Sequence, residues 1–215
     1  MQSPFKRSSK PARTEPKQRA PAAARLSGQI RIIGGQWKRT KLAVPDKPGL
    51  RPTPDRVRET VFNWLGQDMT GWRCLDAFAG TGALGLEAAS RGAREVCLVE
   101  QDPGLVLRLK EVQAKLAATA VHVLRGDGIT VLKQWVPASL DLVFLDPPFD
   151  SGLFETALQA VGRVVQPDGF VYLEAPEAWD DAGLAPFGLR VYRHLLAGAV
   201  HAHLLRPVAG LARIA

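Results

Sequence analysis

Strand and helix patterns alternate without interruption after Gly71, and this alternation limits the chain to very few folds. Short apolar runs typical of buried strands are each followed by apolar residues at helical spacing. Repeated strand–helix units predict an α/β fold with a mostly parallel sheet and helices on both faces. We expect strands near 73–78, 95–100, 121–124, 140–146 and 169–174, and helices near 83–91, 103–117, 128–135 and 153–165.

Both ends of this alternating region carry hairpin patterns. Two final strand patterns, near 189–196 and 199–206, flank Gly198 and predict an antiparallel hairpin. Residues 29–44 partly alternate apolar and basic side chains, which predicts a β-hairpin with one basic, solvated face. A Pro-rich loop follows, and Thr53 and Pro54 then resemble an N-cap and first-turn proline of a helix that runs to Gly66.

Positive charge is concentrated at the amino-terminal end. Residues 1–60 contain 15 Lys or Arg and 4 Asp or Glu, whereas residues 61–215 contain 13 and 17. Residues 1–27 show no apolar periodicity, so we expect a disordered basic arm there, a basic hairpin and loop at 28–52, and one larger domain at 53–215. This distribution favours a polyanionic partner such as a nucleic acid.

Bulk features argue against several other classes. No apolar stretch is as long as a membrane span, so we expect no membrane association. Cys74 and Cys97 each lie in a predicted strand and are interpreted as core residues of a cytoplasmic protein. His201 and His203 share one face of a predicted strand with no third candidate beside them, so we predict no metal site.

A glycine-rich turn follows the first strand of the alternating region. Gly80, Gly82 and Gly85 lie between that strand and a helix, an arrangement that brings backbone and helix-terminal amides close to a ligand. This G-x-G-x-x-G pattern alone also fits a dinucleotide such as NAD. In either case Glu100, at the end of the second strand, could hold a ribose diol, and Asp127, after the third, could accept from an adenine amino group.

Each of these acids also has a structural interpretation. Asp76 could contact a ligand or only stabilise the strand end, Glu100 could cap a helix, and Asp127 could be a turn residue between two glycines.

The string Asp146-Pro147-Pro148-Phe149 follows the apolar run 142–145. It combines a carboxylate, two rigid carbonyls that lack neighbouring amide hydrogens, and an aromatic face. Together these groups suit the task of holding the exocyclic amino group of a nucleobase and stacking on its ring. The pattern therefore indicates amino-group methylation of a nucleic acid.

The order of these motifs resembles that of the S-adenosylmethionine-dependent, Rossmann-like methyltransferases, and Asp146–Phe149 resembles their amino-methylating branch. The stretches 28–37 and 50–65 resemble the RsmD family, the 16S rRNA (guanine(966)-N(2))-methyltransferases of bacteria. The resemblance covers about residues 28–205. One departure is the hairpin turn, where relatives commonly carry a glycine and this chain has Lys38-Arg39-Thr40.

The resemblance implies a seven-stranded Rossmann-like methyltransferase sheet with an antiparallel carboxy-terminal hairpin. It implies transfer of a methyl group from S-adenosylmethionine to the 2-amino group of one guanine of 16S rRNA. We expect the RNA to lie in a small ribosomal subunit or assembly intermediate, although the sequence leaves naked RNA open, and we take a cytoplasmic monomer as the default. The residues predicted to be catalytic are Asp146, Pro147, Pro148 and Phe149. Those predicted to bind the cofactor are Asp76, Phe78, Gly80, Thr81, Gly82, Glu100, Gln101, Asp127, Gly128 and Asp146. Those predicted to bind RNA are Arg31, Trp37, Lys38, Arg39, Lys41, Arg51, Arg56 and Arg58.

Three other functions are compatible with part of the sequence. A DNA adenine amino-methyltransferase uses a very similar tetrapeptide, but normally needs a target-recognition segment for which this chain has no insertion. An NAD-dependent oxidoreductase would leave Asp146–Phe149 unexplained. A non-enzymatic RNA-binding module would explain the basic arm and not the glycine-rich turn.

Overall fold

The computed structural model describes residues 26–47, 50 and 53–208, which form two sheets and their covering helices. The small sheet contains β1 (Leu26–Arg31) and β2 (Lys41–Pro45). The large sheet contains β3 (Arg73–Asp76), β4 (Glu95–Glu100), β5 (Val121–Arg125), β6 (Leu140–Leu145), β7 (Val165–Ala175), β8 (Leu189–Ala197) and β9 (Val200–Pro207). The helices are α1 (Asp55–Leu65), α2 (Ala83–Ser90), α3 (Pro103–Lys115), α4 (Gly128–Gln134), α5 (Phe154–Val164) and α6 (Asp181–Leu184), with 3-10 turns η1 (Phe149–Ser151) and η2 (Ala185–Phe187).

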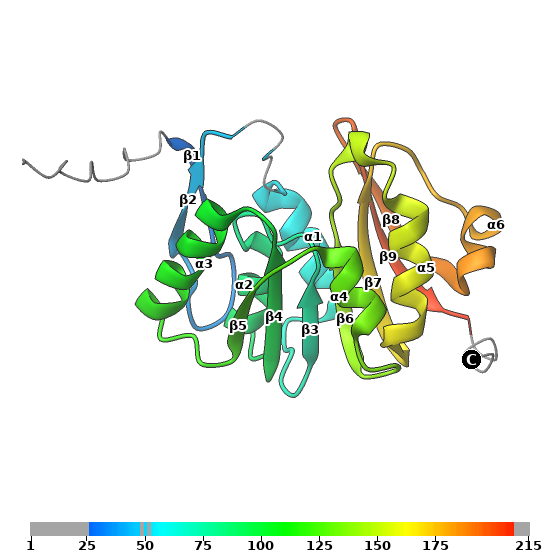
Figure 1. Cartoon of the computed structure of the whole chain (residues 1–215), viewed down its shortest axis with the longest axis horizontal. Coiled ribbons are helices and arrows are strands. Elements are labelled where there is room, and N and C mark those ends of the chain that lie inside the picture. Colours follow the sequence, from blue (N-terminus) through cyan, green and yellow to red (C-terminus); the bar gives the residue numbers. More distant parts are fainter. Residues whose placement is uncertain (1–25, 48–49, 51–52, 209–215) are drawn as a thin grey trace, which may run out of the picture.

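The large sheet has seven strands in the order β5-β4-β3-β6-β7-β9-β8 (Figure 1). Strands β3 to β7 are parallel, and β9 lies antiparallel to both β7 and β8. The predicted mostly parallel sheet with an antiparallel carboxy-terminal hairpin is therefore confirmed. The sheet reverses its order between β3 and β6, and in such sheets ligands bind at the carboxyl ends of the strands beside the reversal.

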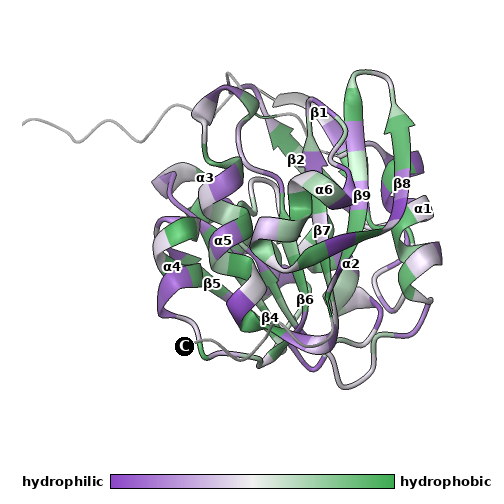
Figure 2. Cartoon of the chain, turned by 90° about the vertical axis from the view of Figure 1, so that its right-hand side faces the viewer, coloured by the Kyte–Doolittle hydropathy of each residue, from purple (hydrophilic) through white to green (hydrophobic). Residues whose placement is uncertain are grey.

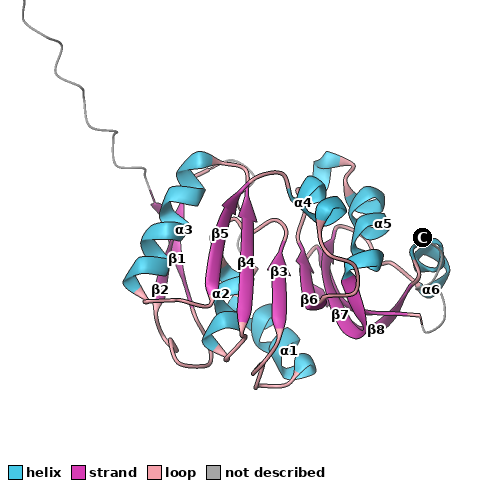
Figure 3. Ribbon diagram, turned by 60° about the horizontal axis from the view of Figure 1, so that its bottom comes forward, coloured by secondary structure: helices cyan, strands magenta, loops and turns pink. Residues whose placement is uncertain are grey.

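Helices cover both faces of the large sheet, which explains why its central strands read as unbroken apolar runs (Figure 3). In β6, Leu142 and Phe144 face the core under α1 and α2, whereas Val143 and Leu145 face the core under α4 and α5. All four side chains are fully buried. Figure 2 shows the same contrast in colour, with hydrophobic strands and more hydrophilic outer helix faces.

Two boundaries differ from the sequence prediction. Strand β1 begins at Leu26, inside the segment predicted to be a disordered arm, because residues 26–31 pair antiparallel with β2. Strand β7 begins at Val165 instead of near 169, since Val165 pairs with Leu140 before an irregularity shifts the register.

The predicted N-cap of α1 is wrong. Pro54 occupies the cap position and makes no side-chain cap hydrogen bond. The hydroxyl of Thr53 instead donates to Glu174 Oε1 at 2.5 Å, on a strand 121 residues further along the chain. A long-range polar partner has replaced the local cap.

The hairpin is docked onto the last turn of α2. The Glu87 carboxylate accepts hydrogen bonds from the backbone amides of Ile33 and Gly34, each at 2.7 Å. Ser90 Oγ accepts from the Trp37 amide at 2.9 Å. A Cβ on Gly35 would lie 1.8 Å from the Ser90 carbonyl oxygen, so this contact requires glycine. The hairpin is thus fixed to the helix that begins at the glycine-rich turn.

Candidate active site

Acidic residues end four of the five parallel strands or the turns that follow them. Asp76 ends β3, Glu100 ends β4, Asp127 follows β5, and Asp146 follows β6. Because the carboxyl ends of parallel strands meet at one edge, the sheet brings these four predicted site residues to the same side of the molecule. Glu174, next to last in β7, joins them there.

Glu100 is bonded to the backbone around the glycine-rich turn. Its Oε2 accepts from the Gly80 amide at 2.9 Å, and its Oε1 accepts from the Asp102 amide at 2.8 Å. Asp102 in turn caps α3 by accepting from the Leu105 amide at 2.9 Å. The acid that could hold a ribose therefore also fixes the turn beside it.

Asp76 contains a buried oxygen that needs a donor. The Gly85 amide donates to its Oδ2 at 3.1 Å, whereas Oδ1 is buried with no partner among the described residues. Burial is the main cause that raises the pKa of Asp76 to about 7; the Gly85 and Phe78 amides oppose this rise, and the Glu100 and Glu174 carboxylates add to it. A buried unpaired carboxylate oxygen suits a cationic donor such as an ammonium group.

The beginning of α4 packs tightly against the end of β3. A Cβ on Gly128 would lie 2.1 Å from the Ala77 carbonyl oxygen, so only glycine fits. Asp127 caps this helix, since its Oδ1 accepts from the Thr130 amide and hydroxyl, both at 2.7 Å. Asp127 therefore has a structural role as a helix cap, whereas the sequence suggested a turn residue as its structural alternative, and its exposed side chain lies at the carboxyl end of β5.

The other predicted cofactor residues surround the same strand ends. Thr81 and Phe78 are half-buried, and Phe78 packs against the core under α4. Gln101 is exposed directly after β4.

The Asp146–Phe149 string leaves the end of β6 and enters η1. The Ser151 amide donates to the Pro148 carbonyl at 3.0 Å, so that carbonyl turns back toward the chain. No donor among the described residues reaches the carbonyl of Pro147. The Phe149 side chain is 37% exposed, and its ring centroid lies 6.3 Å from that of Phe154. The string therefore presents an exposed aromatic ring and a carbonyl without a described donor, the groups from which the sequence predicts binding of a base.

Sequence reasoning missed Glu174, which lies beside Asp146. Leu145 pairs with Leu173 in parallel register, so the next residues, Asp146 and Glu174, are neighbours at the strand ends. Glu174 is 4% exposed, and its Oε1 accepts from Tyr172 Oη at 2.7 Å as well as from Thr53. Its position at the end of the fifth parallel strand is the signal that could have identified it.

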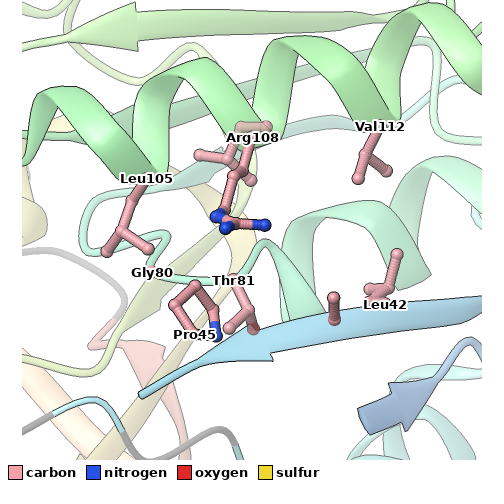
Figure 4. A pocket seen from close by; sticks show the side chains of 9 residues that line it. Leu42, Pro45, Gly80, Thr81, Leu105, Arg108 and Val112 are labelled. Atoms are coloured by element: carbon pink, nitrogen blue, oxygen red, sulfur yellow. The ribbon is translucent and has the colours of Figure 1, made fainter. Parts of the chain in front are cut away.

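Two hollows flank these groups. One is a small hollow between β2, α3 and the glycine-rich turn (Figure 4), where the Arg108 side chain extends from α3 toward Thr81. The other, which is larger, lies beyond Phe154. It is lined by Phe154, Pro176, Glu177, Ala178 and Trp179.

Most of the predicted RNA-binding cations are exposed on the hairpin and α1. Exposed basic side chains of this set are Arg31, Lys38, Arg39, Lys41 and Arg56. Arg31 Nε is 2.8 Å from Asp55 Oδ2, an ion pair at the surface. Arg39 has a φ of 70°, so the turn that lacks glycine places a side chain in the left-handed region. Arg51 lies outside the described residues.

Two predicted RNA contacts have structural roles instead. Arg58 is fully buried, and its guanidinium contacts Glu87 at 3.3 Å, Asp55 at 2.6 Å and the Arg31 carbonyl at 2.8 Å. The structure therefore contradicts RNA contact by Arg58. Trp37 is half-buried against the α1–α2 core, which favours a packing role over RNA contact.

The strand histidines form a cluster that the sequence did not predict. His194 stacks on His203 with ring centroids 4.6 Å apart, and its Nε2 lies 2.9 Å from His201 Nδ1. Trp179 donates its amide to His203 Nε2 at 3.0 Å. Within residues 26–47, 50 and 53–208, no group of three His, Cys, Asp or Glu is arranged to hold a metal. In the same residues no helix has the length and apolar character of a membrane span.

Comparisons with known proteins identify close relatives. A family model described as "Conserved hypothetical protein 95" matches residues 30–206. The chain is 43% identical over 176 residues to "Ribosomal RNA small subunit methyltransferase D" of Escherichia coli K12, covering 81% of this chain and 88% of that protein. The protein of the same name from Haemophilus influenzae is 39% identical over 71% of this chain and 86% of its own length. A solved structure titled "Putative methyltransferase yhhF from Escherichia coli" superposes with a TM-score of 0.72 at 37% identity, covering 84% of this chain and 98% of that one.

Proposed function

The chain belongs to the family described as conserved hypothetical protein 95, and from this membership we propose how its site works and on what. It is a ribosomal RNA methyltransferase, as its relatives' names indicate, and we propose S-adenosylmethionine as its methyl donor. The observation that supports a base-methylating site most directly is the Asp146–Phe149 string, which follows β6 at the same edge of the sheet as the Asp76 and Glu100 carboxylates. The methylated group is the 2-amino group of a guanine, at position 966 of 16S rRNA by family resemblance.

The residues at the strand ends fit S-adenosylmethionine. The unpaired, buried Asp76 Oδ1 suits the amino group of the methionine portion. Glu100 would accept from the ribose hydroxyls, and the tight approach at Gly128 leaves a narrow space in which Asp127 borders the adenine. Gly80, Thr81 and Gly82 would lie along the ligand with Phe78 and Gln101 at its edges. When bound, the sulfonium supplies a methyl group that is already activated.

The protein mainly has to position the amine. A base amine is a poor nucleophile because its lone pair is delocalised into the ring. Hydrogen bonds from its two hydrogens to the Asp146 carboxylate and the Pro147 carbonyl would favour a pyramidal nitrogen with an available lone pair. Phe149 would stack on the extruded guanine, and its exposed ring is suited to this.

The hairpin supplies the contacts that place the RNA. Lys38, Arg39 and Lys41 are exposed on a hairpin fixed to α2, and Arg56 is exposed on α1. Such cations bind phosphates and set orientation without reading sequence. We place the reaction in the cytoplasm, on a small ribosomal subunit or assembly intermediate, with the protein acting as a monomer.

Replacement of Asp146 tests the assignment. In a purified Asp146→Asn variant we expect methyl transfer to undermethylated 16S rRNA or small subunits to fall by at least a hundredfold, while S-adenosylmethionine affinity stays within a few-fold. A matched control is Asp150→Asn, because Asp150 is exposed on η1 only four residues away. Near-normal turnover by Asp146→Asn would refute the role of the string. Transfer to DNA adenine and not to rRNA would refute the substrate.

A further inference from the structure

We propose that Glu174 is a positioning residue for methyl transfer, which makes Asp146 the group that accepts the proton released by the amine. This inference rests on the proposed function and adds to it a second carboxylate outside the family tetrapeptide.

The fold places the two carboxylates side by side. Glu174 and Asp146 follow the paired residues Leu173 and Leu145, so both side chains leave neighbouring parallel strands on the same face. Phe144 and Tyr172 precede them on that face and pack edge to face, with centroids 6.1 Å apart. The two carboxylates therefore follow a pair of packed, buried rings on the same face of the sheet.

Hydroxyl donors hold only one member of the pair. Glu174 Oε1 accepts from both Thr53 and Tyr172, whereas Asp146 accepts no hydrogen bond within the described part of the chain. Loss of hydration raises the pKa of Asp146 well above its usual range, and the negative charges of Glu174 and Asp76 act in the same direction. The two hydroxyls oppose the rise that burial causes in the pKa of Glu174. Asp146 is therefore the stronger base of the pair.

The other charged groups on this face do not neutralise the pair. Asp76 on β3 is a third acid, and Glu100 on β4 lies beyond it. Arg58 on α1 is occupied by Asp55 and by Glu87 on α2. The Tyr172 hydroxyl is itself held in its neutral form, because burial and Glu174 raise its pKa.

This arrangement provides an acceptor for the proton that the amine must lose. A nitrogen–carbon bond forms as the sulfur–carbon bond breaks with its electron pair on sulfur, and the nitrogen is left with one hydrogen too many. That proton passes to the Asp146 carboxylate, which must be ionised beforehand. A carboxylate whose pKa is raised is a stronger base for this step. Glu174 acts through Asp146 without touching the substrate.

A charge role and a scaffolding role predict different effects in two variants. Glu174→Gln removes the charge but retains an oxygen for the Thr53 and Tyr172 hydroxyls. Thr53→Val retains the charge but removes one hydrogen bond. We expect the acid limb of the single-turnover rate to move down by about one pH unit in Glu174→Gln, with a maximal rate roughly threefold to tenfold lower. In Thr53→Val Glu174 keeps its titratable carboxyl group, so the limb should stay in place or move down by much less than in Glu174→Gln.

A second measurement follows the pKa of Asp146 directly and does not require methyl transfer. Carbon NMR of aspartate-labelled, ligand-free protein follows the Asp146 carboxyl, assigned by its loss in Asp146→Asn, and its midpoint should also fall by about one unit in Glu174→Gln. Equal shifts in both variants, or no shift in Glu174→Gln, would overturn the proposal. Absence of methyl transfer by wild-type protein would contradict the proposed function, and the NMR titration would still decide whether Glu174 controls Asp146.

Discussion

Glu87 is the residue whose loss should most disturb the hairpin. Its side chain is fully buried and accepts from two hairpin amides, and it contacts the guanidinium groups of Arg58 and Arg91. Glu87→Ala would leave two buried guanidiniums without this carboxylate, although Arg58 would keep its contact with Asp55.

The size of the effect follows from those contacts. Removing one partner of a buried ion pair costs about 3–5 kcal/mol. Each unpaired buried amide adds about 1–3 kcal/mol, although water and relaxation will satisfy part of this demand. We therefore expect Glu87→Ala to lower the free energy of unfolding by about 5 kcal/mol, a large share of the roughly 5–15 kcal/mol typical of a domain. Glu87→Gln keeps one acceptor oxygen and should lose less, about 3 kcal/mol.

Urea unfolding followed by tryptophan fluorescence measures both losses. Glu95→Ala is the matched control, because Glu95 pairs with Arg73 at 3.1 Å while their side chains are 38% and 40% exposed. Such a surface pair contributes about 0–1 kcal/mol. If Glu87→Ala were no more destabilising than Glu95→Ala, the carboxylate would not be what holds the hairpin.

Four further predictions address the turn, the cofactor and the arm. Arg39→Gly should raise the free energy of unfolding by about 1 kcal/mol, because glycine adopts the left-handed φ of 70° without steric cost; unchanged stability in thermal unfolding would contradict this. The same variant should bind rRNA more weakly, because a cation is removed. Glu100→Ala should weaken S-adenosylmethionine binding by about 1.5–3 kcal/mol in calorimetry, and an unchanged affinity would place Glu100 outside the pocket. S-adenosylmethionine affinity should rise with pH up to about 7 and should lose this rise in Asp76→Asn. The raised pKa of Asp76 keeps its carboxyl group protonated and neutral below that pH, and ionisation then favours binding of the ligand's ammonium group. Residues 1–25 contain seven Lys or Arg and one Glu. Deleting them should reduce the slope of log RNA affinity against log salt concentration by roughly 0.7–0.9 for every phosphate that these residues neutralise. Superimposable plots for the two proteins would show that they neutralise none.

The sequence predicts the sheet well because its central strands are buried on both faces. Runs such as 142–145 leave no other interpretation, and the acids that follow them must gather at one edge. Patterns of this kind depend on neighbours in the chain, and so they predict that Asp76, Glu100 and Asp146 lie at one edge of the sheet, as the structure has them.

What the sequence could not predict depends on distant partners. Arg58 has the spacing of a surface cation on an amphipathic helix, yet Glu87, 29 residues away, draws it into the core. Thr53 has the type and position of a helix cap, yet Glu174 takes its hydroxyl. Neither of these long-range contacts can be read from the neighbouring sequence, because the partners of buried polar groups are set by proximity in the fold and not by spacing along the chain.

The docking of the hairpin on α2 also fixes a length. The glycine-rich turn precedes Ala83 and the hairpin contacts Glu87 and Ser90, so α2 holds the two features about 6–11 Å apart. A helix this short cannot bend appreciably, so if the hairpin binds phosphates as we propose, they would sit at a set distance from the reacting nucleotide. The protein would then select its target by where that nucleotide lies on a folded RNA, and a loop one nucleotide longer or shorter would present its neighbour instead.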